Sequence, residues 1–463
     1  MKVSRTQAAL LALLGLYLLS GRAAQAQITW SPPQPVAPDT AAFVRQSWHS
    51  VAARDTALWV LWGEDRGPGQ YYLKASRYSE AAGAWLEPEL VAADTVWRFD
   101  VEAAVDADLN PWAGFGPSWS RKQGDTWISP QPLPYDTVGV NRWLDVCSDP
   151  EQGIWAVWVN YNYDEEYWFS FFSSYCRTDT WATPILFDEG IMCLAPYVPL
   201  ITAPPGGEVR VVWLSAYSIL SATWSGDSWV NREHVSFGWY PSVCNDSAGG
   251  TWLMWYDGYP GGSIRCARHD GTAWTDTWTL ASGERVFCHK GMLCCDDQGR
   301  VWAMWLDYPE GICVRYFDGT VWSETSVVAP GYDTPFPRIV AAQGRVWVTW
   351  RERESDDRWL VYYSYTQGPG VAEQESRRFD AVRVSPSVVR AGTAIRLAGL
   401  EPGQTAILLD AAGRSVELPA VNAGSSSRTL DLSTAKLSPG VYFVRITGPG
   451  RPVSRKVLVV RGK

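Results

Sequence analysis

Gly299-Arg300-Val301-Trp302-Ala303-Met304-Trp305 is the stretch that decides the fold of this chain. The same apolar run, with tryptophans three residues apart, recurs at 59–62, 155–158, 252–255 and 347–350, and weaker copies begin near 112 and 210. The seven copies lie 42 to 55 residues apart, a period typical of propellers and repeat arrays. We therefore predict an all-β chain with a seven-bladed β-propeller.

The clearest repeat, residues 286–328, has an internal order that predicts one blade. Short apolar strands are expected at 292–295, 301–306, 312–317 and 322–328, and turns rich in Asp and Gly separate them. Four such strands form one antiparallel sheet. The first turn recurs in register, because an aspartate stands six residues before a tryptophan at Asp106, Asp149, Asp246 and Asp296.

The fourth strand has its own signature, a tryptophan followed by polar residues and proline. Six copies begin at Trp85, Trp127, Trp181, Trp229, Trp274 and Trp322. The seventh is at the front of the chain, where Trp30-Ser31-Pro32-Pro33-Gln34-Pro35-Val36 closely imitates residues 127–133. The N-terminal strand is therefore expected to close the last blade and remove an open sheet edge.

Composition divides the chain into parts. All 28 tryptophans lie between Trp30 and Trp359, and residues 384–463 carry eleven Lys/Arg against four Asp/Glu, a net charge of +7 in a chain of net charge −9. We predict a propeller over 27–366, a polar linker over 367–383 and a small β-sandwich over 384–463.

Residues 1–26 are typical of a secretory signal peptide. Lys2 and Arg5 precede an apolar run, and Ala24-Gln25-Ala26 gives a small-x-small cleavage pattern. No other segment has the length of a membrane span, so no transmembrane segment is expected in the mature chain. The acidic propeller segment disfavours nucleic acid as a partner.

Cysteine and histidine spacing indicates neither a metal site nor a cofactor. The four histidines are scattered, and none shows the spacing of a zinc site. Cys147, Cys244 and Cys294 occupy the same place in three repeats, which favours small buried thiols over a disulfide ladder. With nine cysteines in an exported chain, the pairing of the others stays open.

Two resemblances follow from these segments. At the turn between third and fourth strands, Ser120, Gly124, Thr126 and Trp127 resemble the Asp-box of sialidase-like propellers, although Lys122 stands where that motif has aspartate. Three other repeats keep its glycine, at Gly226, Gly271 and Gly319. The resemblance implies a propeller and gives little support to sialidase chemistry.

The last eighty residues are similar to the type IX secretion C-terminal sorting domain. The match rests on Asp410-Ala411-Ala412-Gly413-Arg414, on residues 430–433, on 437–444 and on the terminal strand at 456–460, with Ser385 where that family more often has Asn before Pro. The resemblance implies a partner, the type IX secretion machinery, and export to the outer surface of a bacterium or to the medium.

Loops after the second strands and between blades open on one face of a propeller, around its channel, and we call this the channel face. Its aromatic and charged side chains suit glycan or peptide recognition. The candidate binding residues there are Trp48, Trp97, Arg98, Arg142, Trp143, Trp239, Asp257, Tyr259, Asp307, Tyr308 and Arg338. A structural role competes, because such tryptophans can pack between sheets and such aspartates can cap turns.

The residues therefore predict binding of an extracellular carbohydrate or protein, without catalysis. One alternative is a secreted sialidase-like glycoside hydrolase or lyase, in which Arg98, Arg142 and Arg338 converge on a substrate carboxylate beside Tyr332-Asp333. The other is a structural surface or adhesion component. Hydrolysis demands convergent carboxylates or arginines at the channel, whereas a lectin demands accessible aromatic rings.

Overall fold

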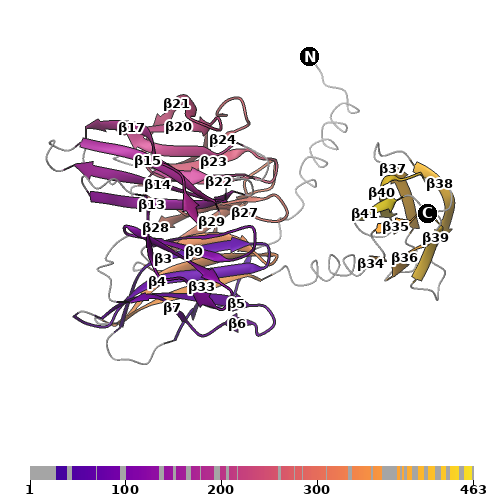
Figure 1. The fold of residues 1–463 in the computed structure, drawn as a ribbon, viewed down its shortest axis with the longest axis horizontal. Helices are drawn as coiled ribbons and strands as arrows, with labels where there is room; N and C mark the ends of the chain where they lie inside the picture. Colours follow the sequence, from indigo (N-terminus) through magenta and orange to yellow (C-terminus); the bar gives the residue numbers. More distant parts are fainter. Residues whose placement is uncertain are drawn as a thin grey trace, which may run out of the picture. The chain divides into compact units, whose positions relative to one another are not determined.

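The structure is a computed structural model, and every regular element of its described residues is a strand (Figure 1). The chain divides into two compact units, residues 1–367 and 368–463. The structure describes residues 28–38, 44–68, 70–93, 101–134, 140–149, 153–162, 168–177, 179–191, 199–204, 208–215, 217–258, 262–275, 277–283, 285–308, 310–331, 336–355, 358–367, 383–385, 388–390, 394–398, 405–410, 415–422, 429–433, 438–447 and 453–460. Among these residues, no helix has the length and apolar character needed to cross a membrane. The expected signal peptide lies outside the described residues.

Five separate sheets of four or five strands make up most of the first unit. The first sheet contains β8 (Val101–Val105), β9 (Pro111–Phe115), β10 (Ser118–Gln123), β11 (Thr126–Trp127) and β12 (Gln131–Pro132), and the second contains β13 (Val140–Asp149), β14 (Gly153–Asn162), β15 (Trp168–Arg177), β16 (Thr180–Trp181) and β17 (Ile185–Ile191). The third contains β18 (Leu200–Thr202), β19 (Arg210–Ser215), β20 (Ser218–Trp224) and β21 (Trp229–Phe237), and the fourth contains β22 (Trp239–Asn245), β23 (Thr251–Asp257), β24 (Ser263–His269) and β25 (Trp278–Ser282). The fifth contains β26 (Val286–Phe287), β27 (Leu293–Cys295), β28 (Val301–Asp307), β29 (Gly311–Phe317) and β30 (Ser326–Ala329).

The remaining strands of this unit form one ten-stranded sheet. It contains β1 (Thr29–Trp30), β2 (Gln34–Pro35), β3 (Val44–Arg54), β4 (Ala57–Asp65), β5 (Tyr71–Ser79), β6 (Ala84–Trp85), β7 (Glu89–Ala93), β31 (Arg338–Ala342), β32 (Arg345–Ser355) and β33 (Arg358–Gln367). The prediction of seven separate blades is therefore corrected to five. The cause is β3, whose first residues, Val44 and Arg45, pair in parallel with Arg358 and Trp359 of β33 and fuse two repeats.

The sheets adopt a propeller arrangement. The first strands of successive repeats contact one another in the order β3, β8, β13, β18, β22, β27 and β31, and β31 contacts β3 again. These strands are called the inner strands below. Because they return on themselves, they enclose a central space, and the expected all-β propeller architecture is confirmed.

Tryptophan pairs of the second strands form the core between sheets. In the second strands β14, β23 and β28, both tryptophans of each pair are at most 1% exposed. An aromatic ring of this size buries about 150–250 Å² of surface, worth roughly 4–6 kcal/mol before the entropy of ordering it is counted.

The recurrent aspartate of the first turn has a structural role. In Asp296, Oδ1 accepts the backbone N–H groups of Gln298 and Arg300, while Oδ2 accepts the Nε1–H of Trp302 at 2.8 Å. Asp106 and Asp246 bind their tryptophans in the same way, each at 2.9 Å. The spacing of six residues therefore ties each turn to the core ring that follows it.

Proline lies at the break of four of the fourth strands, where it cannot donate to the ladder, and the strands that begin at Trp274 and Trp322 are interrupted without a proline. At the break, a serine of the third strand donates to the carbonyl that follows the tryptophan. This contact recurs at 2.7 Å for Ser76 and Leu86, Ser120 and Ile128, and Ser174 and Ala182. The strand β21 has no proline and runs unbroken over nine residues.

Residues 29–35 take the place of a fourth strand beside β33. Trp30 pairs with Thr366 and Gln34 with Tyr363, and Ser364 Oγ donates to the Ser31 carbonyl at 2.7 Å, as in the other repeats. Trp30 Nε1 also donates to Ser326 Oγ of β30 at 3.1 Å. The start and the end of the described part of this unit are thereby joined.

The second unit contains two sheets. The first has the order β34 (Arg383–Ser385), β36 (Ala394–Ala398) and β39 (Thr429–Ser433), and the second has the order β35 (Val388–Arg390), β41 (Val453–Val460), β40 (Gly440–Thr447), β37 (Thr405–Asp410) and β38 (Ser415–Asn422). The strands expected near 394–397, 406–409, 441–446 and 456–460 coincide with β36, β37, β40 and β41.

Candidate functional site: the channel face

One register position of the inner strands carries most of the polar side chains of the central space. In each repeat, the inner-strand residue at this position pairs with the residue of the second strand that lies two positions after the first tryptophan of that second strand. Five repeats place the following residues there: Ser50 opposite Leu61, Glu102 opposite Gly114, Asp145 opposite Val157, Ser242 opposite Met254, and Arg338 opposite Thr349.

Three of these residues hold neighbouring sheets together. Ser50 Oγ accepts the Ala103 N–H at 3.1 Å, and Asp145 Oδ2 accepts the Ile201 N–H at 2.9 Å. Ser242 Oγ accepts the Met292 N–H at 2.9 Å. Each bond joins an inner strand to the next repeat. Part of the role of this register position is therefore to hold adjacent sheets together.

Glu102 organises a charged cluster across the central space. Its Oε1 lies 2.7 Å from Nζ of Lys290 and 3.0 Å from Nη2 of Arg338, and its Oε2 accepts the hydroxyl of Ser50 at 3.2 Å. The three charged side chains are only 9–12% exposed. Lys290 Nζ also donates to the Leu144 carbonyl at 2.7 Å, so one ammonium group bridges three sheets. Such a buried arrangement is favourable only where hydrogen bonds offset the cost of removing the charges from water.

Asp145 lies in the field of this cluster. Burial, together with the nearby Glu102 carboxylate, raises the pKa of its carboxyl group to about 7, although Lys290, the Ile201 N–H and Arg338 each lower it. Asp145, Glu102, Lys290 and Arg338 all line one cavity of about 180 Å³, together with residues of all the inner strands. The cavity therefore combines two carboxyl groups with two cations.

An aromatic band lies at the ends of the strands that open on the channel face. Its inner part runs through four half-buried rings: Trp48 and Phe336 have centroids 4.3 Å apart, Phe336 and His289 5.4 Å, and His289 and Tyr240 5.0 Å. These rings come from three inner strands or the residues directly before them, and from the loop before β27. They form a continuous polarisable surface over several repeats.

The outer part of the band continues from the neighbouring residue, Trp239. Ring centroids are 5.7 Å apart between Trp239 and Tyr217, 6.1 Å between Trp239 and Tyr256, and 5.9 Å between Tyr256 and Phe287. Phe287 in turn lies 6.0 Å from Tyr308. Tyr217 is 38% exposed, so the outer part of the band reaches solvent.

Backbone strain accompanies this band. Tyr240 and Phe336 have φ values of 52° and 59°, in the left-handed region that bulky residues avoid. Each precedes a proline and lies two residues before the shared register position, at Ser242 and Arg338. Strained residues cost about 1–3 kcal/mol each and cluster at functional sites. Because the same strained conformation occurs in two repeats, we infer that it serves to position these rings.

The predicted site residues fall into three groups. Trp48, Trp239 and Tyr308 belong to the aromatic band, and Arg338 is buried in the charged cluster. Asp257 is half-buried and accepts Arg265 Nε at 3.0 Å. Asp307 is half-buried, and burial, followed by Glu310, raises the pKa of its carboxyl group. The third group is beyond structural description: Trp97, Arg98 and Tyr259 lie outside the described residues, and for Arg142 and Trp143 only the backbone in β13 is described.

Sequence reasoning missed Glu102, Asp145 and Lys290. For the first two a signal exists, because each stands ten residues before the first tryptophan of its repeat, as Ser242 also does. Lys290 has no such signal. Its side chain extends from a loop and contacts other sheets, and these contacts form only because the inner strands close into a ring.

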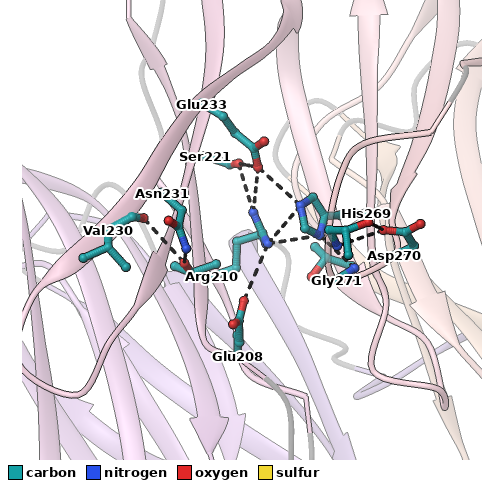
Figure 2. A network of polar contacts seen from close by, with 12 residues as sticks. Glu208, Arg210, Ser221, Val230, Asn231, Glu233, His269, Asp270 and Gly271 are labelled. Atoms are coloured by element: carbon teal, nitrogen blue, oxygen red, sulfur yellow. Dashed lines mark hydrogen bonds and ion pairs between the residues drawn. The ribbon is translucent and has the colours of Figure 1, made fainter.

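A second polar network lies at the opposite ends of the strands, between β19–β21 and β24 (Figure 2). Arg210 donates to Glu233 Oε1 at 3.0 Å, and the same oxygen accepts Ser221 Oγ and Trp274 Nε1, each also at 3.0 Å. His269 Nδ1 lies 3.1 Å from Arg210 Nη2 and accepts the Gly271 N–H at 3.1 Å. The Glu233 oxygen is fully occupied, so this network packs two sheets together.

Other chemistry that the sequence raised has little structural support. Within the described residues, no group of three or more His, Cys, Asp or Glu side chains is arranged to hold a metal ion. Eight cysteines of that part of the chain are unpaired, and burial raises the pKa of the Cys147, Cys244 and Cys294 thiols. Convergence of three arginines stays an expectation, because only Arg338 has a described side chain.

Comparison with known proteins finds similar solved structures at low sequence identity. No family model matches the chain, and no curated protein matches it. Similar solved structures include PorZ, a surface component of the type IX secretion system of Porphyromonas gingivalis, at 13% identity and TM-score 0.43, covering 89% of this chain and 59% of PorZ. They also include the six-bladed lectin of Aleuria aurantia, at 12% identity and TM-score 0.42, covering 62% of this chain and 96% of the lectin.

A third similar structure is the N11 neuraminidase-like protein of a bat influenza virus, at 10% identity and TM-score 0.38, covering 74% of this chain and 94% of that protein. Of the three structures, PorZ is the longest protein, and this chain spans about three fifths of its length. At these identities and TM-scores, the similarities assign neither a ligand nor a reaction.

Proposed function

We propose that this protein is an exported binding module whose channel face takes an extracellular carbohydrate. The aromatic band carries the proposal, because half-buried rings from several repeats offer flat apolar faces on which sugar rings stack. Carboxyl and ammonium groups of the neighbouring cavity supply directional hydrogen bonds to hydroxyl groups. A protein ligand is the other outcome that the test below distinguishes.

Export and surface location belong to the same proposal. The signal peptide at 1–26 and the type IX sorting resemblance over 384–463 support delivery to the cell surface or the medium. We also infer that the ten-stranded sheet holds two of the seven sequence repeats, because seven inner strands return on themselves. Deleting residues 384–463 should retain the protein inside the cell, which fractionation of the producing bacterium would measure.

A glycan array probed with the full chain tests the binding proposal. We expect retention on a defined set of glycans, and Trp239→Ala should lower it at least tenfold because it removes the ring at the centre of the band. Leu186→Ala is the matched control, since that side chain is 47% exposed on β17, outside the band. Retention unchanged by Trp239→Ala, or no retention at all, would contradict the proposal.

A second candidate function, cleavage of a glycan, has one specific observation in its favour. Glu102 and Asp145 line the same cavity, and glycoside hydrolysis uses two carboxyl groups. Glu102 is fully engaged by Lys290, Arg338 and Ser50, which favours a structural role for it. Loss of sugar from the array, abolished by Asp145→Asn, would establish cleavage.

A further inference from the structure

Among the residues that the structure describes, the central cavity has one acceptor and one donor with spare hydrogen-bonding capacity. Asp145 Oδ2 accepts the Ile201 N–H, whereas no hydrogen bond to Oδ1 is found within the described residues. Lys290 Nζ has three N–H groups, of which two are directed to Glu102 and the Leu144 carbonyl. One ammonium N–H therefore remains for a further acceptor.

These two groups act on each other. Among the charged neighbours of Asp145, Lys290 has the largest effect on its carboxyl group, ahead of Glu102 and Arg338. Both side chains line the cavity of about 180 Å³. Ligand pockets for drug-sized molecules span about 300–1,000 Å³, so this cavity suits a smaller polar group.

Glu102 and Arg338 complete the arrangement without competing for a ligand. Glu102 is engaged on both oxygens, and Arg338 donates to Glu102, to the Lys290 carbonyl and to the His49 carbonyl. Their contacts fix Lys290 in place on both its side chain and its backbone. The fixed ammonium group is a preorganised donor, which lowers the entropy cost of binding.

We propose that Asp145 and Lys290 together bind two adjacent hydroxyl groups of a sugar ring that ends in this cavity. One hydroxyl donates to the carboxylate of Asp145, and its neighbour accepts from the ammonium group of Lys290. A vicinal diol matches this donor and acceptor pair, whereas a single carboxylate or a single amine satisfies only one of the two groups.

Residues of the aromatic band are close neighbours, in the sequence, of residues that line this cavity. His289 directly precedes Lys290, and Phe336 stands two residues before Arg338. A glycan stacked on the inner part of the band can therefore place its terminal ring among the charged groups. This inference rests on the proposed carbohydrate binding and names the position at which the sugar's terminal ring is recognised.

Titration of the full chain with free neutral monosaccharides tests the inference. Galactose, mannose, glucose and fucose are the probes, and ligand-observed NMR with calorimetry measures binding. We expect at least one to bind, and Asp145→Asn or Lys290→Gln to weaken it about tenfold, the value of one charge-assisted hydrogen bond. Leu186→Ala should leave it unchanged.

The pH dependence provides a readout that a purely structural role of Asp145 would not give. Because its pKa is raised to about 7, with Lys290, Arg338 and Glu102 facing it, the ionised acceptor forms as pH rises. Affinity of the wild-type chain should increase from pH 6 to pH 8. The wild-type profile needs no variant, so it tests the inference even where Asp145→Asn fails to fold.

The outcomes separate the two proposals. Retention on the glycan array without monosaccharide binding, or monosaccharide binding that is independent of pH and of Asp145, overturns the diol site and leaves the channel-face proposal standing. Absence of any glycan binding overturns both. Monosaccharide binding that is lost in Asp145→Asn, and kept by a folded Trp239→Ala, supports the diol site as separate from the band.

Discussion

The Nζ atom of Lys290 lies 2.7 Å from Oε1 of Glu102, although Lys290 is in the loop before β27 and Glu102 is in β8, two repeats that are not neighbours in the ring. Arg338 binds the same oxygen at 3.0 Å. Two cations therefore share one carboxylate in a region of little solvent.

Removal of this carboxylate should destabilise the first unit. Glu102→Gln keeps the shape of the side chain but leaves Lys290 and Arg338 without a counter-charge, and we expect a loss of about 3 kcal/mol in the free energy of unfolding. Urea unfolding followed by tryptophan fluorescence measures it. Glu87→Gln, at an exposed position, is the control and should change stability by less than about 0.5 kcal/mol.

Closure by the N-terminal strand can be tested with two serines in equivalent places. Ser364 donates to the Ser31 carbonyl and Ser174 to the Ala182 carbonyl, both at 2.7 Å. Each substitution by alanine should cost about 1 kcal/mol. If Ser364→Ala alone is silent in urea unfolding, residues 29–35 do not close the sheet in solution.

The contribution of two histidines to stability should fall as the solution becomes acidic, whereas Asp145, whose pKa is raised, contributes in the opposite direction. Burial, followed by Arg338, lowers the pKa of His49 to about 3 and that of His289 to about 4, both below the usual 6.5. Their neutral forms stabilise the folded state, and this contribution is lost as pH falls from 6.5 towards these values. Thermal unfolding between pH 7.5 and pH 4 measures the effect. His289→Gln should flatten the curve, and an unchanged slope would contradict the assignment.

The network in Figure 2 should contribute to the stability of the folded protein through its buried arginine. Arg210 has a side chain only 4% exposed, and its loss leaves Glu233 without its cation. We expect Arg210→Ala to cost about 2 kcal/mol. Glu208→Ala provides the comparison, because that carboxylate is 61% exposed and 4.0 Å from Arg210, and it should have almost no effect.

The cysteines should be chemically silent in the folded protein. Burial raises the pKa of the Cys176 and Cys313 thiols to about 12 and that of Cys295 to about 11, and thiols rather than thiolates are present at pH 8. Iodoacetamide should leave these residues unmodified in buffer and modify them in urea, as mass spectrometry of peptides would show. Rapid labelling of Cys176 in the native protein would contradict its buried environment.

Local sequence was sufficient for the repeat and its turns. The pairs of tryptophans predicted the second strands, and the recurrent aspartate predicted a turn. The bond between that aspartate and the tryptophan six residues later was found only in the structure. The second strands and the turns are short-range features, because strand periodicity and turn chemistry depend on residues within about ten positions. Trp48, Trp239, Tyr308 and Arg338 were predicted to lie at the channel face from their place between strands, and their role in binding stays a prediction.

The repeated strand pattern and the residues that fill it were determined by the sequence alone, because the hydrophobic period and the turn residues are local features of the chain. Only the tertiary structure decided that β3 and β33 pair in parallel and that Lys290 meets Glu102. It also decided which rings touch to form the band. These contacts join residues from separate repeats, and their distances depend on how the ring closes, which no local pattern encodes.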